Sequence, residues 1–317
     1  MFVVGGESLI DLVSAPRMEG EPISMQAHQG GSPYNCAIAL ARLGNDTGFL
    51  CPISKDGFGS YLLEPLESAG VRPLLAERVA APTTLAVVTL DAAGKAQYEF
   101  YRGADRALTA DTGIAALPAS PVAYQIGGFC PIEAEDAMVW RQVVEAAFDR
   151  GATISFDPNV RPSLLSDPEG YRERLSDFLD LAHIIKISEE DLAWLDDSRS
   201  IEEHAQALLQ RPNCRLVVVS LGEEGSRAFT SAGSVKAGIY SPMIFKDTVG
   251  AGDSLMAGIL CWLSDNGRLG ANEMSALDDD ALTRMLRFAA VVAGLNCAEE
   301  GCNPPTRDQV DAVLSGK

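Results

Sequence analysis

From residue 122 onward, short apolar runs alternate with segments whose apolar residues recur at helical spacing. The runs predicted as strands are Val122–Ile126, Thr153–Phe156, His183–Ile187 and Leu216–Ser220, and the predicted helices are Ala134–Asp149, Pro168–Leu181, Ser188–Leu195 and Ile201–Leu209. This alternation is typical of a parallel sheet with helices on both faces. We therefore predict a doubly wound α/β fold, in which ligands bind at the carboxyl ends of the strands.

The first third of the chain has a less regular pattern. It predicts strands at Phe2–Gly6 and Thr47–Ile53, helices at Pro33–Leu43 and Gly57–Ala69, and a hairpin of Leu85–Leu90 with Gln97–Tyr101 around Asp91–Gly94. The hairpin is out of phase with the doubly wound part, so we interpret it as a small β appendage. Because no linker, repeat or low-complexity tract divides the chain, we expect one domain over residues 1–317.

The composition excludes several classes of partner. A formal net charge of -19 and a pI near 4.5 argue against nucleic acid and against anionic membrane surfaces. The seven cysteines are scattered and fit neither a disulfide framework nor a zinc site. The N-terminus lacks the features of a signal peptide, and no apolar run is long enough to span a bilayer. We therefore expect a cytoplasmic protein.

The stretch Lys246–Ser254 reads Lys-Asp-Thr-Val-Gly-Ala-Gly-Asp-Ser and leads into an apolar run that predicts a buried helix. Its glycines allow a tight turn, and the N–H groups at a helix N-terminus bind anions. An acid there, Asp253, is the group that phosphoryl transfer to an alcohol needs as a base. Alternatively, the same residues are an ordinary helix cap after a glycine turn.

Two stretches together resemble the signatures of the ribokinase-like (PfkB) sugar kinases. Gly30–Gly44 is similar to the first signature and Asp247–Ser254 to the second, and the resemblance covers essentially the whole chain. It implies a ribokinase-like α/β domain whose mostly parallel sheet is flanked by helices. It also implies a small β-sheet lid at about residues 12–29 and 83–108, and ATP-dependent, Mg²⁺-assisted phosphorylation of a sugar hydroxyl. Neither a P-loop nor a Rossmann glycine motif is present.

The resemblance also implies roles for the residues that bind and activate the sugar. Asp253 would be the general base, and the N–H groups of Gly250, Ala251 and Gly252 would form the anion hole. The sugar would be bound by Asp11, Gly30, Gly31 and Asn35. Taken alone, Asp11 is more readily explained as a surface or turn aspartate, and Asn35 as a polar residue near a helix N-terminus.

For the nucleotide, the resemblance implies contacts from Ser188, Ser220, Gly222, Gly225 and Asn296. Ser188 and Asp191 stand where the family has Asn and Glu, so Asp191 would bind Mg²⁺ through water. Alternatively, Ser188 to Asp191 is a helix start with acidic first-turn residues, Ser220 to Gly225 is a hairpin, and Asn296 is a polar helix end.

A potassium ion is a further expectation, because many members of the family bind one near the anion hole. Asp247, Val249 and Gly301 match that loop. Pro305 replaces a residue that often contributes a ligand, which leaves the need for potassium open.

The sequence is compatible with more than one sugar as the substrate. Residues 6–13, the signature at 30–35 and residues 100–105 are most similar to the fructokinase branch. A 2-keto-3-deoxygluconate kinase is the main alternative, since Arg102 and Arg161 are placed to bind a carboxylate. A nucleoside kinase and a sugar-binding regulator without turnover are further alternatives. A homodimer formed through the lid is also expected.

Overall fold

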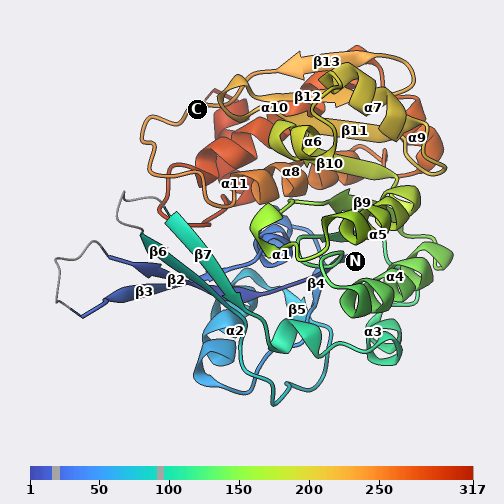
Figure 1. The fold of residues 1–317 in the computed structure, drawn as a ribbon. Coiled ribbons are helices and arrows are strands. Elements are labelled where there is room, and N and C mark those ends of the chain that lie inside the picture. The colour runs from blue at the N-terminus through green and yellow to red at the C-terminus, as the bar shows by residue number, and fades with distance from the viewer. Residues whose placement is uncertain (16–21, 91–95, 317) are drawn as a thin grey trace.

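A computed structural model describes residues 1–15, 22–90 and 96–316 of the chain (Figure 1). Its larger sheet has nine strands in the order β13-β12-β11-β10-β9-β8-β1-β4-β5. Their bounds are β1 Phe2–Gly5, β4 Thr47–Leu50, β5 Arg72–Pro73, β8 Ala123–Gly127, β9 Thr153–Asp157, β10 Ile184–Ser188, β11 Leu216–Ser220, β12 Ser226–Phe229 and β13 Ser234–Ala237. In this order, the seven neighbouring strands from β11 through β5 pair in parallel. Strands β12 and β13 extend the sheet beyond β11 in antiparallel pairing.

Helices cover both faces of this sheet. Their bounds are α1 Ser32–Arg42, α2 Gly57–Ala69, α3 Ala110–Ala116, α4 Ala134–Asp149, α5 Pro168–Leu181, α6 Glu189–Leu195, α7 Ile201–Leu209, α8 Ala251–Asp265, α9 Ala271–Ser275, α10 Asp279–Asn296 and α11 Arg307–Leu314. Short 3-10 turns occupy Ala104–Arg106, Pro162–Leu164 and Gly222–Glu224. No helix in the described residues is long and apolar enough to cross a membrane.

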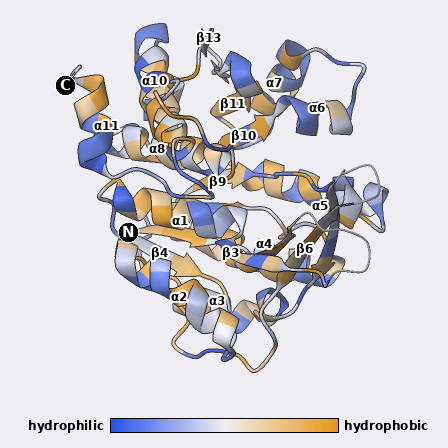
Figure 2. Ribbon diagram, turned by 90° about the vertical axis from the view of Figure 1, so that its left-hand side faces the viewer, coloured by the Kyte–Doolittle hydropathy of each residue, from blue (hydrophilic) through white to orange (hydrophobic). Residues whose placement is uncertain are grey.

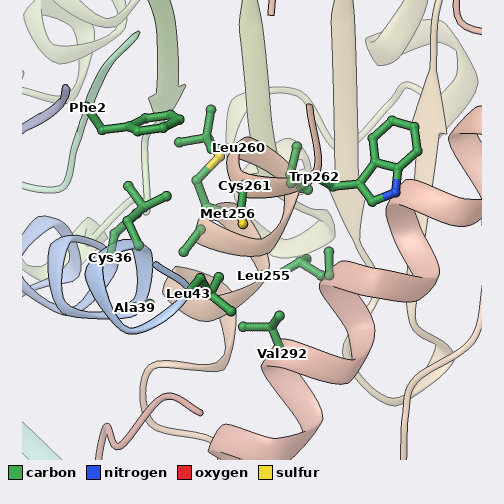
Figure 3. Packing of buried hydrophobic residues seen from close by; sticks show 14 of the residues in the cluster. Phe2, Cys36, Ala39, Leu43, Leu255, Met256, Leu260, Cys261, Trp262 and Val292 are labelled. Carbon is green, nitrogen blue, oxygen red and sulfur yellow. The ribbon is translucent and has the colours of Figure 1, made fainter. Parts of the chain in front are cut away.

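The two faces of the sheet form two separate core layers, because successive strand residues point to opposite sides. Ile184 and Val218 pack with α1, α8 and α10, whereas Ile185 and Val217 pack with α4, α5 and α7. Figure 3 shows side chains of the first layer, including Met256 and Leu260 of α8. In Figure 2 the central strands are predominantly hydrophobic and the outer helices mix hydrophobic and hydrophilic residues. Helix α8 is therefore held rigidly under the sheet.

A second, smaller sheet stands beside the first (Figure 1). It comprises β2 Leu9–Ser14, β3 Met25–Gly30, β6 Leu85–Leu90 and β7 Ala96–Tyr101, in the order β3-β2-β6-β7. Its register places Asp11 opposite His28 on β3 and Ala86 on β6, so these side chains share one face. The predicted turn at Asp91–Gly94 and residues 16–21 lie outside the described residues.

The doubly wound fold and the small sheet predicted from the sequence are confirmed. Helices α2, α4, α5 and α7 and strand β11 have the predicted bounds. The strand predicted to start at Val122 starts at Ala123, and the helix predicted to start at Ser188 starts at Glu189. Ser188 instead caps that helix from the end of β10, which is a one-residue correction with a direct physical cause.

Candidate active site

The glycine turn lies at the N-terminus of α8, as its sequence predicts. Gly250 is the N-cap residue and has a left-handed backbone with φ 74°. A Cβ at this position would lie 2.3 Å from Sγ of Cys302, so only glycine fits. The Ala251 N–H donates to the Thr248 carbonyl at 3.1 Å. Of the four amides from Gly250 to Asp253, the other three have no acceptor among the described residues.

Asp253 lies in the first turn of α8 and is buried. Its Oδ1 accepts a hydrogen bond from Oγ of Ser32 at 2.6 Å, and its Oδ2 accepts one from Nδ2 of Asn35 at 2.9 Å. Burial raises the pKa of Asp253 to about 6, and the bonds from Ser32 and Asn35 oppose that rise. The structure thus joins the two glycine signatures at one carboxylate.

Ser32 itself is fixed by a carboxylate that the sequence analysis did not assign to the site. Oε1 of Glu7 accepts the Ser32 N–H at 3.2 Å, and Oε2 accepts the Phe129 N–H at 3.0 Å. Burial raises the pKa of Glu7 to about 7. Gly31 precedes Ser32 with φ 114°, and a Cβ there would lie 2.7 Å from the carbonyl oxygen of Glu7. Glu7 and Ser32 are therefore additions to the predicted site.

Asp11 approaches the same region from the small sheet. A Cβ on Gly30 would lie 2.4 Å from Oδ2 of Asp11, so glycine is required for this close contact. Burial raises the pKa of Asp11 to about 6, and the positive charges of His28 and Arg161 act against that rise. Asp11 and Gly30 are thereby brought into contact, and the charge of Arg161 acts on the Asp11 carboxyl.

The two candidate arginines have different surroundings. Arg102 forms ion pairs with Asp105 at 2.6 Å and with Asp136 at 2.9 Å, and its side chain is 11% exposed. It ties the end of β7 to α4, and carboxylates of the protein itself already pair with its guanidinium. Nη1 of Arg161 donates only to backbone oxygens in the described residues, those of Asn159 at 3.4 Å and Val160 at 3.2 Å.

Ser188 and Asp191 form a capping box at the start of α6. Oγ of Ser188 accepts the Asp191 N–H at 3.0 Å, and Oδ2 of Asp191 accepts the Ser188 N–H at 3.4 Å. Oδ1 of Asp191 accepts the Val160 N–H at 3.0 Å. The helix-start interpretation of this motif is thus confirmed, and each oxygen of the Asp191 carboxylate accepts one backbone amide.

A buried lysine lies below the glycine turn and was not identified from the sequence. Nζ of Lys186, on β10, donates to Oδ2 of Asp157, on β9, at 2.7 Å, and both side chains are buried. A Cβ on Gly252 would lie 3.4 Å from Nζ of Lys186. Burial lowers the pKa of Lys186, but the nearby carboxylates, Asp157 foremost, more than compensate for that effect, so the ammonium stays charged. A positive charge therefore stands beside the N-terminus of α8.

The predicted nucleotide loop follows β11. Ser220 ends that strand, and the loop closes into a hairpin because the Leu221 N–H donates to the Gly225 carbonyl at 2.8 Å. Gly222 has φ 54°, and a Cβ there would meet no other atom within 4 Å. The hairpin interpretation is confirmed, and the nucleotide contacts stay a prediction.

Asn296 joins two loops. Its Nδ2 donates to the Val249 carbonyl at 2.7 Å, and its Oδ1 accepts the Asn303 N–H at 3.0 Å. The side chain is fully buried, so the structure confirms a polar residue at the end of α10, and its nucleotide contact stays a prediction. The Asp247 carboxylate accepts the amides of Val249 at 2.8 Å and Gly301 at 2.7 Å, which brings the three predicted potassium ligands together.

Comparisons with known proteins agree with this geometry. The profile described as "pfkB family carbohydrate kinase" matches residues 1–309. The chain is 32% identical over 322 residues to "Probable fructokinase-3" of Arabidopsis thaliana, which covers 99% of this chain and 90% of that protein. It is also 32% identical over 330 residues to "Fructokinase-2" of Solanum lycopersicum, which covers 100% and 96% of the two chains.

Solved structures show the same architecture. Fructokinase with bound ATP from Xylella fastidiosa superposes with a TM-score of 0.88 at 27% identity, over 99% of this chain and 98% of that chain. Ribokinase from Giardia lamblia superposes with a TM-score of 0.81 at 24% identity, over 99% and 98%, and is similar in fold. The ribokinase-like fold implied by the sequence signatures is confirmed.

Proposed function

This chain belongs to the pfkB family of carbohydrate kinases, and we propose that within it the chain transfers the γ-phosphoryl group of ATP to a hydroxymethyl oxygen of fructose. The observation that carries the proposal is Asp253, a buried carboxylate at a helix N-terminus that is held by Ser32 and Asn35 of the other signature. Support for fructose comes from relatives named fructokinase that match over nearly the full length of both chains.

In the proposed mechanism, Asp253 accepts the proton of the attacking hydroxyl. Its pKa of about 6 leaves most of the carboxylate ionised at neutral pH and lies close enough to that pH for efficient general-base catalysis. The free amides of Gly250 and Gly252 donate hydrogen bonds to the charge that develops on the phosphoryl oxygens. The partial positive charge at the start of α8 and the nearby ammonium of Lys186 reinforce them.

The donor set at this helix N-terminus fits a nucleotide phosphate. When bound, ATP with its divalent metal supplies the phosphoryl group and neutralises part of its charge. The described residues contain no group of three or more His, Cys, Asp or Glu side chains that could hold a metal ion. Mg²⁺, which we propose as the metal, would therefore depend on phosphate oxygens and water, as is usual for this ion. Asp191 would contribute only through such a water.

The small sheet is proposed to act as the lid over the sugar. Asp11 lies on one of its faces beside Gly30, and Oδ1 of Asn35 remains available because its Nδ2 is bound to Asp253. A carboxylate and an amide oxygen can together accept hydrogen bonds from adjacent sugar hydroxyls. Closure of the sheet over the sugar would exclude water and suppress hydrolysis of ATP.

A second substrate, 2-keto-3-deoxygluconate, is favoured by one observation. The guanidinium of Arg161 has no carboxylate ion-pair partner among the described residues, and its positive charge acts on the Asp11 carboxyl. An arginine in that position can bind a substrate carboxylate through two hydrogen bonds. Arg102 gives no such support, because Asp105 and Asp136 already pair with it.

Potassium activation and dimerisation are two further parts of the proposal. Asp247, Val249 and Gly301 converge through their hydrogen bonds. The carboxylate oxygens of Asp247 and the carbonyl oxygen of Val249 each accept one hydrogen bond and keep a lone pair for a cation.

The small sheet exposes large apolar side chains that a second copy of the sheet would cover. These are Val13 and Tyr98 on one face and Met25 and Tyr101 on the other. Sedimentation of the purified chain at micromolar concentration should show a dimer that Tyr98→Lys weakens.

The proposed function is tested by ADP release from Mg-ATP with fructose and with 2-keto-3-deoxygluconate in parallel, in potassium and in choline salts. Turnover with fructose, at a rate that Arg161→Gln changes less than about threefold, is the expected result. Turnover with the keto-acid alone, abolished by Arg161→Gln, would replace fructose by the second candidate. Turnover with neither sugar would refute both, and nucleosides and other sugars would then be assayed before a regulator without turnover is considered.

A further inference from the structure

Glu7 and Gly31 fix the backbone of Ser32 at the start of α1. Its N–H donates to Oε1 of Glu7 at 3.2 Å, and Glu7 is in turn anchored by the Phe129 N–H at 3.0 Å. Gly31 approaches the backbone of Glu7 so closely that no larger residue fits before Ser32. These contacts fix the Ser32 backbone and therefore the position of its Cβ, from which the hydroxyl projects.

The Ser32 hydroxyl is directed at the carboxylate of Asp253. The Oγ to Oδ1 distance is 2.6 Å, which lies in the range of a hydroxyl that donates to an ionised carboxylate. Asn35 holds the other carboxylate oxygen at 2.9 Å. Because the single Ser32 proton is used in this bond, its oxygen can still accept a hydrogen bond from a sugar hydroxyl.

We propose that Ser32 is a positioning residue for phosphoryl transfer, whose hydroxyl orients the Asp253 carboxylate and keeps it ionised and ready to accept the proton of the attacking hydroxyl. This inference deepens the proposed function and rests on its assignment of Asp253 as the base. Ser32 acts through Asp253 and is distinct from Asn35, to which the resemblance assigns a contact with the sugar.

Other charged and titratable groups face Asp253 from the elements packed around α8. They are Cys36 of α1, Asp157 of β9, Lys186 of β10 and Cys302 of the loop before α11. Burial raises the pKa of both thiols well above its usual value, so they are neutral at physiological pH. Asp157 and Lys186 act on Asp253 in opposite directions. Because the effects of Asp157 and Lys186 on the pKa of Asp253 oppose each other, the side chains of Ser32 and Asn35 are left to favour the ionised carboxylate.

The inference is tested by titrating the Asp253 carboxyl directly. Protein labelled with ¹³C at aspartate carboxyls is followed by NMR from pH 4 to pH 9, and the Asp253→Asn variant assigns the resonance. Ser32→Ala should raise the midpoint by about one pH unit, because it removes a charge-assisted hydrogen bond to the ionised form. Ser32→Thr, which keeps the hydroxyl, should restore the midpoint toward that of the wild type.

The same shift should appear in the acid limb of the kcat/KM profile. Ser32→Ala should lose about tenfold in kcat/KM at a pH below both midpoints and recover most of it above pH 8. If Ser32→Ala folds poorly, Ser32→Cys gives the same test, because a thiol is a weaker donor. An unshifted midpoint in the folded Ala or Cys variant would overturn the inference, as would a Thr variant that titrates like Ala.

The NMR titration needs neither ATP nor sugar. Failure of the proposed function would therefore appear as a wild type that phosphorylates none of the sugars, while the Asp253 midpoint still responds to Ser32. Failure of the inference would appear as active wild type whose Asp253 midpoint is indifferent to Ser32. The two failures are distinguishable.

Discussion

Replacing Asp253 with asparagine should abolish most of the activity and at the same time stabilise the fold. The carboxyl ionises near its ordinary pKa of 3.8 in the unfolded chain, and burial raises that pKa to about 6 in the folded protein. The folded state therefore binds this proton more tightly, and stability falls as the pH rises through this window. Two pKa units correspond to about 3 kcal/mol at neutral pH, and Asp253 is only 8% exposed, so solvent screening reduces this value little.

Asparagine removes the charge and keeps the shape of the side chain. Its Oδ1 can still accept the Ser32 hydroxyl, and the amide of Asn35 can rotate to present its oxygen to the new Nδ2. We expect Asp253→Asn to raise the free energy of unfolding by up to about 3 kcal/mol at pH 8 and by only about 0.5 kcal/mol at pH 4. Without the general base, kcat should fall by about 10²–10⁴-fold.

Urea unfolding at pH 4 and pH 8 measures the first effect, and ADP release at saturating sugar measures the second. Asp280→Asn on α10 is the matched control, since its side chain is 79% exposed and its loss should change stability little at either pH. Near-wild-type turnover of Asp253→Asn would refute the assignment of the base. Equal stabilisation at both pH values would refute the account of its burial.

Two further substitutions test the surroundings of the base. Gly250→Ala should cost kcat at least tenfold and destabilise the fold by more than about 1 kcal/mol, because the new Cβ meets Cys302 in a left-handed turn. Gly267→Ala, with φ 62° in open space, isolates the backbone cost, and equal losses in the two variants would contradict the steric argument. Lys186→Met should destabilise by about 3–5 kcal/mol, because it leaves Asp157 charged and buried. Adding Asp157→Asn should recover part of that loss in urea unfolding, and no recovery would show that the ion pair is not the cause.

Much of the fold follows from periodicity and local signals. Helix α2 begins after Asp56, whose carboxylate accepts the Gly59 N–H, and ends at Gly70 in a left-handed conformation, both of which are signals readable in the sequence. The small sheet was predicted as a hairpin with additional β segments, but its order was not, since the parallel pairing of β2 with β6 joins residues more than 70 positions apart. Pairing between such distant segments produces no pattern in the sequence around either strand.

The site shows the same division. Asp253 and its glycine turn were identified because a helix N-terminus is a local feature. Glu7 and Ser32 were missed because their roles depend on contacts between distant segments. Lys186 carried a usable signal, since a single lysine in a buried apolar strand needs a paired charge. The partner of Arg102 was also readable, because Asp105 follows three residues later.

The most direct test of phosphoryl transfer to a sugar is the ³¹P NMR spectrum of the products formed from ATP and fructose. We predict a new phosphomonoester resonance that is split into a triplet by the two protons of a hydroxymethyl carbon, with ADP formed in equal amount. The same signal should be absent with Asp253→Asn over the same period. A spectrum that contains only ADP and inorganic phosphate, with no phosphomonoester, would contradict the account.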